Sequence, residues 1–233
     1  MSEQAVIARP RQARAHTAVP APGTALRALA VAGLLVLALA AVWALAELVP
    51  SIHVKDAVGL YEMTTLNSAR VDPALRFLLH LLNPSLFILW AIALIAFAMA
   101  GERPRVAVAV AAVMSLAPFT AEQLKPVLAH QHDSVGYVTI NAASWPSGHA
   151  TAATALALCA VLVAPRRWRP LVAVIGGAYV LACSVAMLVL AWHMPSDVIG
   201  GILLSSLFMA LAVAALRASE RAFPPRRVKA AGA

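Results

Sequence analysis

Charged side chains are scarce in this chain of 233 residues. Asp, Glu, Lys and Arg make up 12% of it, whereas 62% is hydrophobic, and the mean hydropathy is +0.82. The few charges gather in short patches that separate apolar runs of membrane-spanning length. This shortage of charge argues against a soluble domain and predicts an all-α integral membrane protein.

Cysteine is almost absent as well. Cys159 and Cys183 are the only two, and both lie inside apolar runs, where small packing residues are the simpler interpretation than a disulfide or a metal pair. The sequence also contains nothing that resembles a cage of metal-binding carboxylates. We therefore expect neither a cofactor nor a metal.

Cutting the chain at its polar patches leaves six apolar runs, each close to the roughly 20 residues that cross a bilayer. The six expected spans are Leu26 to Val49, Pro84 to Ala100, Val106 to Leu124, His149 to Ala164, Leu171 to Trp192 and Val198 to Leu216. We expect a six-span domain over residues 26–217, preceded by a disordered cytoplasmic arm (1–25) and followed by a basic cytoplasmic tail (218–233). A cleaved signal peptide is the alternative for the first run, which is about twice as long as such segments usually are.

Basic residues are divided unequally between the two sides of these spans. Fourteen of the 18 Lys and Arg fall on one side, and only Lys55, Arg70, Arg76 and Lys125 fall on the other. The positive-inside rule then places both termini in the cytoplasm. The net charge of +8 therefore indicates topology and contact with anionic lipid, not nucleic-acid binding. The Ala-rich and Arg-rich composition and the short loops favour a bacterial plasma membrane.

The segment between the first two spans, Ser51 to Asn83, is too polar to cross. Its apolar residues recur mostly at helical spacing, and Pro73 opens a second stretch after Asp72, which we expect to act as a cap. This pattern predicts interfacial amphipathic helices on the outer side. They could guide a lipid headgroup to a site, or simply pack against the ends of the spans.

Chemistry-bearing side chains gather in three places on the outer side, and Lys125 marks the first. Glu122 lies one turn before it, and His130, His132 and Asp133 follow. A lysine at the end of a span is commonly an anchor that reaches the membrane interface. Taken alone, this cluster favours that interpretation.

The second place is the run Pro146-Ser147-Gly148-His149, just before an apolar helix. A capping Ser and a Gly at a helix start leave backbone N–H groups and the positive end of the helix dipole free to bind an anion. His149 would stand in the first turn, within reach of that anion. Ordinary helix capping beside an interfacial histidine is the alternative.

The third place is His193 with Asp197 four residues later. A carboxylate at this spacing can accept the Nδ1 proton and leave Nε2 as a nucleophile or base. Alternatively, Asp197 is only an acidic residue favoured in the first turn of a helix, with Ser196 as a cap.

Together, the order and spacing of these clusters resemble the type 2 phosphatidic acid phosphatase superfamily, whose soluble relatives are bacterial acid phosphatases and vanadium haloperoxidases. That family carries Lys-x6-Arg-Pro, then Pro-Ser-Gly-His, then Ser-Arg-x5-His-x3-Asp. This chain has the complete second motif and supplies Lys125, His193 and Asp197 at the matching positions. The resemblance runs from about Val54 to Leu216.

The resemblance implies six membrane helices and a site on the outer side. His193 would attack phosphorus and carry a phosphohistidine, Asp197 would orient it, and His149 would protonate the leaving oxygen. The substrate would be a membrane lipid phosphate or an isoprenoid (di)phosphate, reached from the outer leaflet. Its phosphoryl oxygens would be held by Lys125, Ser147 and the Gly148 N–H, with His132 in place of a family arginine.

Both arginines of the family motifs are replaced. His132, followed by Asp133, stands where the family has Arg-Pro, and Met187, preceded by Ala186, stands where it has Ser-Arg. Neither Met nor a neutral His reproduces the two-pronged binding of phosphate by arginine. Three interpretations follow. The first is a lipid phosphate phosphatase with a rebuilt pocket. The second is a relative that uses the same histidine for phosphotransfer, or on a substrate that brings its own cations, and the third is a scaffold that binds a headgroup with little or no turnover.

Overall fold

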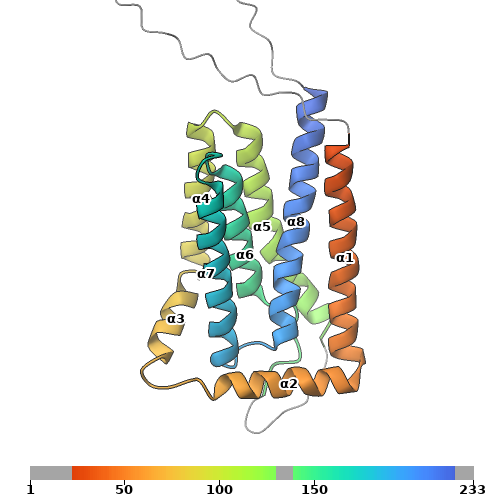
Figure 1. Ribbon diagram of the computed structural model, residues 1–233, viewed down its shortest axis with the longest axis vertical. Coiled ribbons are helices and arrows are strands. Elements are labelled where there is room, and N and C mark those ends of the chain that lie inside the picture. The colour runs from red at the N-terminus through yellow and green to blue at the C-terminus, as the bar shows by residue number, and fades with distance from the viewer. Residues whose placement is uncertain (1–22, 130–138, 224–233) are drawn as a thin grey trace, which may run out of the picture.

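The computed structural model describes residues 23–129 and 139–223, which form eight α-helices and no strand. Helices α1 and α4 to α8 stand upright, α2 lies across one end of them, and the short α3 lies at the same end (Figure 1). The helices are α1 (Thr24–Leu48), α2 (Pro50–Thr64), α3 (Asp72–His80), α4 (Pro84–Ala100), α5 (Pro104–Val127), α6 (Gly148–Val163), α7 (Arg169–Val189) and α8 (Pro195–Ala222).

Proline marks most of the helix starts. Six of the eight described helices, all except α1 and α6, have Pro at the first or second position. Proline fits there because its fixed φ is already helical and its missing N–H would have had no partner within the helix. Proline therefore defines where most of the described helices begin.

Four helices, α1, α5, α7 and α8, are long and apolar enough to cross a membrane. Helices α3 and α4 pass the same test as a pair that is bent by 50°, and α6 is a shorter apolar helix. The described chain thus has four or five candidate spans by length and composition. The count of six stays a prediction.

One local expectation is wrong. The residue before α3 is Val71, with no side-chain cap, and Asp72 pairs with Arg76 instead of capping. Helix α8 ends at Ala222, and the domain boundaries stay a prediction. The expected arm lies almost wholly outside the described residues, and so does the end of the tail.

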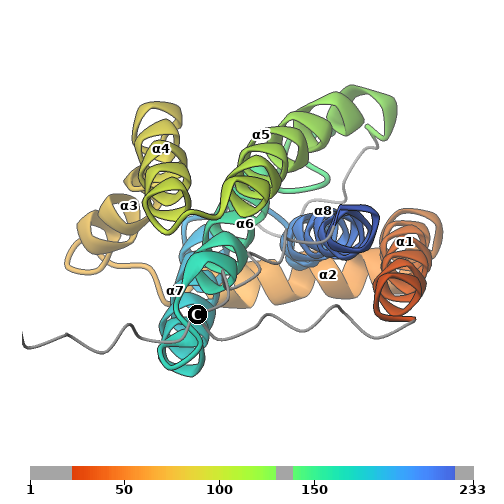
Figure 2. The same cartoon turned by 90° about the horizontal axis from the view of Figure 1, so that it is seen from above.

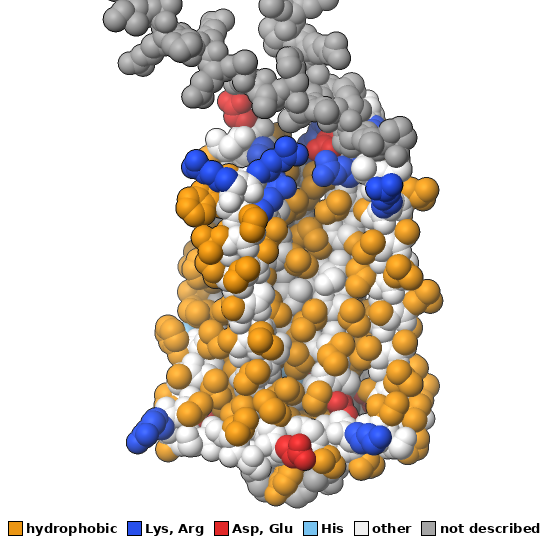
Figure 3. All heavy atoms as spheres, viewed as in Figure 1, with side chains coloured by type: hydrophobic (Ala, Val, Ile, Leu, Met, Phe, Trp, Pro, Cys, Tyr) orange, Lys and Arg blue, Asp and Glu red, His pale blue; other side chains and the backbone are white. Residues whose placement is uncertain are grey.

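Apolar side chains cover the outside of the bundle. Leu37, Val108 and Val174 are 67%, 70% and 70% exposed, respectively, on three different upright helices. On the face shown in Figure 3, a wide apolar band separates basic side chains, which are concentrated at the end opposite α2, from a few charged side chains at the α2 end. So much exposed apolar surface fits contact with lipid and not with water.

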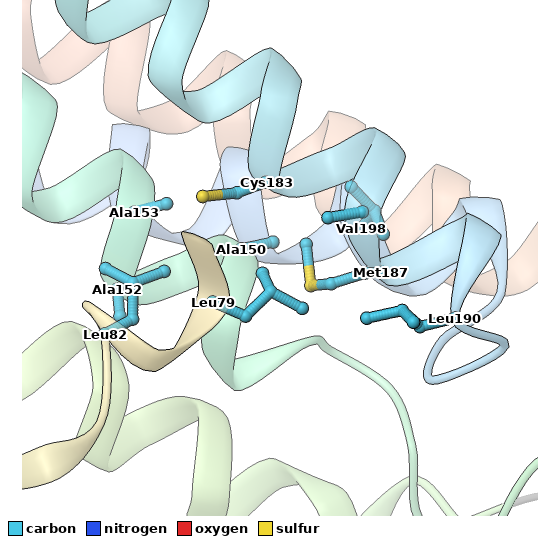
Figure 4. Close-up of a cluster of buried hydrophobic side chains, with 10 residues drawn as sticks. Leu79, Leu82, Ala150, Ala152, Ala153, Cys183, Met187, Leu190 and Val198 are labelled. Carbon is cyan, nitrogen blue, oxygen red and sulfur yellow. The ribbon is translucent and has the colours of Figure 1, made fainter. Parts of the chain in front are cut away.

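Helix α6 lies inside the bundle and packs against α4, α5, α7 and α8, while α1 packs along α8 at one edge (Figures 1 and 2). Its buried face is made of small residues such as Ala150, Ala153 and Ala155, which allow neighbouring helices to approach closely. One buried cluster joins α6 and α7 to Leu79 of α3 (Figure 4). This packing fixes the start of α6, where the Pro-Ser-Gly-His run lies.

Candidate active site

The start of α6 is capped by Ser147, as the sequence predicted. The Ser147 hydroxyl oxygen accepts a hydrogen bond from the Ala150 N–H at 3.3 Å. The same hydroxyl donates to Met187 Sδ at 3.4 Å, and the Ser147 side chain is fully buried. Ser147 therefore holds the helix start in shape, and its hydroxyl is already engaged in this structure.

The start of α8 holds the His193 and Asp197 pair. The Nδ1 atom of His193 lies 3.2 Å from Asp197 Oδ2, which also accepts the Met194 N–H at 2.9 Å. Because a carboxylate only accepts, this contact favours the tautomer with its proton on Nδ1 and leaves Nε2 with a free lone pair. Asp197 is fully buried, whereas the His193 side chain is 12% exposed. Asp197 thus contacts both the helix start and the imidazole. The expected cap at Ser196 is wrong, because the N-cap residue of α8 is Met194.

The starts of α6 and α8 are joined by a backbone hydrogen bond and lie in close contact. The Ser147 N–H donates to the backbone oxygen of Asp197 at 3.0 Å. Two consecutive glycines of α8 make this approach possible: a Cβ at Gly200 would lie 2.8 Å from the Trp145 ring, and one at Gly201 would lie 2.5 Å from the Ser147 backbone oxygen. The Gly-Gly pair is therefore required by the close contact between two helix starts.

Lys125 reaches the same place from the last turn of α5. Its Nζ forms an ion pair with Glu122 Oε1 at 2.7 Å. A Cβ placed on Gly148 would lie 3.6 Å from Lys125 Nζ and 2.7 Å from Glu122 Oε1. Both charged groups therefore lie against the first residue of α6, which brings the first and second polar clusters together.

His149 occupies the first turn of α6 and joins the second cluster to the third. Its ring packs at a tilt against Trp192, with 5.4 Å between the ring centroids. Its imidazole also interacts electrostatically with His193, Lys125 and Glu122. The structure thus gathers Lys125, the Pro-Ser-Gly-His run and the His193 pair at one end of the bundle, the end covered by α2 (Figure 1).

Met187 and His132 stand at the positions of the two motif arginines. Met187 is fully buried in the cluster formed by α3, α6 and α7, with Leu79 and Leu190 beside it (Figure 4). An apolar side chain has thus filled the space and contacts the capping Ser147. His132 lies outside the described residues, and so do His130 and Asp133.

Asp56 of α2 is a site neighbour that the sequence analysis did not single out. Its carboxylate accepts the Ser196 N–H at 3.2 Å and the Ser196 hydroxyl at 2.5 Å. Burial raises the pKa of the Asp56 carboxyl, against the lowering effect of the hydrogen bonds from Ser196. Asp56 therefore ties α2 to the residue next to Asp197.

The described residues contain no group of three or more His, Cys, Asp or Glu side chains placed to hold a metal ion. The arrangement instead offers an oriented imidazole, a second imidazole, one lysine and the start of a helix. These are groups that suit a phosphate or another small anion.

Comparison with known proteins agrees with this assignment. The family model described as PAP2 superfamily matches residues 104–221, which include all three polar clusters. A solved structure, the first transmembrane PAP2 type phosphatidylglycerolphosphate phosphatase from Bacillus subtilis, is similar with a TM-score of 0.66 and 17% sequence identity, covering 84% of this chain and 98% of that one. Comparison with the curated proteins gave no match. Because the family model spans more than half of the chain and the folds agree, this chain belongs to the PAP2 superfamily.

Proposed function

We propose that this protein is a membrane lipid phosphate phosphatase that acts on a phosphomonoester or an isoprenoid (di)phosphate. In the first step, the lone pair on His193 Nε2 attacks phosphorus. An N–P bond forms, the P–O bond to the lipid breaks, and His149 gives its proton to the leaving oxygen. Asp197 keeps the proton on His193 Nδ1 and balances the positive charge of the phosphohistidine.

Water completes the cycle in the second step. His149, now neutral, removes a proton from a water molecule that attacks phosphorus. The N–P bond breaks, inorganic phosphate leaves, and both histidines return to their starting states. Lys125 and the Gly148 N–H hold the phosphoryl oxygens throughout. We include His132 in this set, and Ser147 if its hydroxyl turns from Met187 to the phosphate.

The observation that carries the proposal is the contact between His193 and the fully buried Asp197. Burying a carboxylate away from solvent is costly, and orienting the partly exposed imidazole of His193 is a function that would account for this cost. A protein that only held a headgroup would need an anion pocket but no oriented nucleophile. Phosphotransfer by the same histidine and a scaffold of low activity remain the alternatives.

The direct test is phosphate release from a panel of detergent-solubilised lipid phosphates. The parent protein should release phosphate, and His193→Ala should abolish both release and any acid-labile phosphoenzyme. His80→Ala is the matched control, because His80 is an exposed histidine at the same end of the bundle. An inactive but folded parent would favour the scaffold, and transfer of phosphate to an added alcohol without release would favour the transferase.

We further propose six spans, α1 and α4 to α8, in a bacterial plasma membrane, with both termini in the cytoplasm and the site outside. The support is the concentration of Arg at the end opposite α2, which fits the positive-inside rule. Helix α6, with 16 residues, is the shortest of these proposed spans and is surrounded by α4, α5, α7 and α8.

Cysteine labelling tests this orientation. In a background without Cys159 and Cys183, a cysteine at Asn141 should react with an impermeant thiol reagent on intact cells. A cysteine at Trp168, in the loop between α6 and α7, should react only after lysis. The reverse pattern would move the site to the cytoplasmic face.

A further inference from the structure

Glu122 lies where the proposed mechanism needs a phosphate. Its Oε1 atom pairs with Lys125 Nζ at 2.7 Å and would touch a Cβ on Gly148 at 2.7 Å. The Glu122 side chain is 57% exposed and that of Lys125 is 21% exposed. The carboxylate therefore lies on the solvent side of Lys125, against the first residue of α6.

As a contribution to stability, this ion pair is minor. Exposed pairs three residues apart on a helix contribute little to the free energy of unfolding. Its effect on binding is larger, because Lys125 is the cation that the described structure brings to the start of α6, and Glu122 neutralises it. A bare phosphate dianion would have to displace one carboxylate while Asp197 adds a second negative charge nearby.

A substrate that brings its own positive charge removes this conflict. An ammonium group on the substrate can replace Lys125 as the partner of Glu122, since both are the same chemical group. Lys125 is then free to turn to the phosphate, and the number of ion pairs rises instead of falling. Met187 stands where the family motif has an arginine, and it is an apolar packing residue. The site therefore has one cation fewer to balance the phosphate, and a cation on the substrate contributes more to binding.

We propose that Glu122 is a specificity-determining residue that selects phosphates carrying an ammonium group beside the phosphate over phosphates that lack one. The inference deepens the proposed function, because it assumes that the pocket at Lys125 and Gly148 is the phosphate site. Glu122 binds the ammonium group of the substrate, and Lys125 binds its phosphate. The headgroup region of the lipid substrate is then zwitterionic.

Two small ligands of nearly equal shape test the proposal. O-phosphoethanolamine and n-propyl phosphate differ in that an ammonium group replaces a methyl group. Their binding to the purified protein in detergent can be followed by ³¹P NMR titration, which needs no turnover. The parent should bind phosphoethanolamine about three- to tenfold more tightly than propyl phosphate.

The variant Glu122→Gln should lose this preference, and it should bind propyl phosphate about three- to tenfold more tightly than the parent does, because Lys125 is released. Glu62→Gln is the matched control, since it removes the same charge from an exposed position of α2. It should leave the preference unchanged.

Three results would overturn the inference: no binding of either ligand to the parent, equal binding of both, or a preference that survives Glu122→Gln. The binding experiment and the phosphate-release experiment test the two proposals separately. A parent with the expected preference but without phosphate release would reject the phosphatase and keep the specificity of Glu122. A parent that releases phosphate and binds both ligands equally would do the opposite.

Discussion

Replacing Asp197 by Asn should lower kcat by about 10²- to 10⁴-fold while leaving the protein folded. Asp197 Oδ2 accepts both the His193 Nδ1–H and the Met194 N–H, whereas its Oδ1 has no hydrogen-bond partner among the described residues. An amide can keep its oxygen at the Oδ2 position and its NH₂ group at the Oδ1 position. The main loss is then the negative charge that balances a phosphorylated His193.

The measurement is kcat on a short-chain lipid phosphate, with the thermal midpoint of the same sample as the check on folding. Asp72→Asn is the matched control, since Asp72 pairs with Arg76 in an exposed turn of α3 and such pairs contribute little. A folded Asp197→Asn protein with unchanged kcat would mean that the carboxylate serves only the start of α8.

The cap and the histidine pair could be predicted from sequence because both are local. Ser147 caps a helix that begins at the next residue, and Asp197, in the first turn of α8, lies four residues beyond His193, which precedes that helix. Contacts of this kind follow from helix geometry and residue type alone. The prediction that the three clusters form one site rested on the resemblance to a family, because the spacing of the clusters does not determine how the helices pack.

Asp56 was missed because its partner is 140 residues away in the chain. A lone carboxylate in an amphipathic helix usually faces water, and only the position of α2 across the bundle brings it to Ser196. The same limit applies to Glu122. Its place one turn before Lys125 was visible in the sequence, but its contact with the start of α6 depends on how α5 and α6 pack.

The replaced arginine at Met187 shows how packing changes the meaning of a substitution. From the sequence, only the absence of a cation at residue 187 is evident. In the structure, the Met187 side chain packs among Leu79, Leu190 and Ala150 (Figure 4). Its sulfur accepts a hydrogen bond from the capping Ser147. In this chain Met187 therefore supports the start of α6.

Gly201→Ala should destabilise the protein by about 3 kcal/mol and lower its activity. The new Cβ would lie 2.5 Å from the Ser147 oxygen and 2.9 Å from the Thr151 nitrogen, both backbone atoms. Backbone cannot rotate away as a flexible side chain can, so the start of α6 would have to move. That shift would displace Gly148 and His149 from Lys125 and His193.

Gly177→Ala supplies the control, because Gly177 lies within α7 and an added Cβ there would meet nothing within 4 Å. Alanine is better than glycine inside a helix by about 1 kcal/mol, so this variant should be neutral or slightly more stable. Thermal unfolding in detergent, followed by phosphate release at a temperature where both variants are folded, separates the two effects. If Gly201→Ala unfolds at the same temperature as Gly177→Ala, the starts of α6 and α8 are not in the close contact described. If it is destabilised yet keeps full activity when folded, that contact supports the bundle without positioning the site.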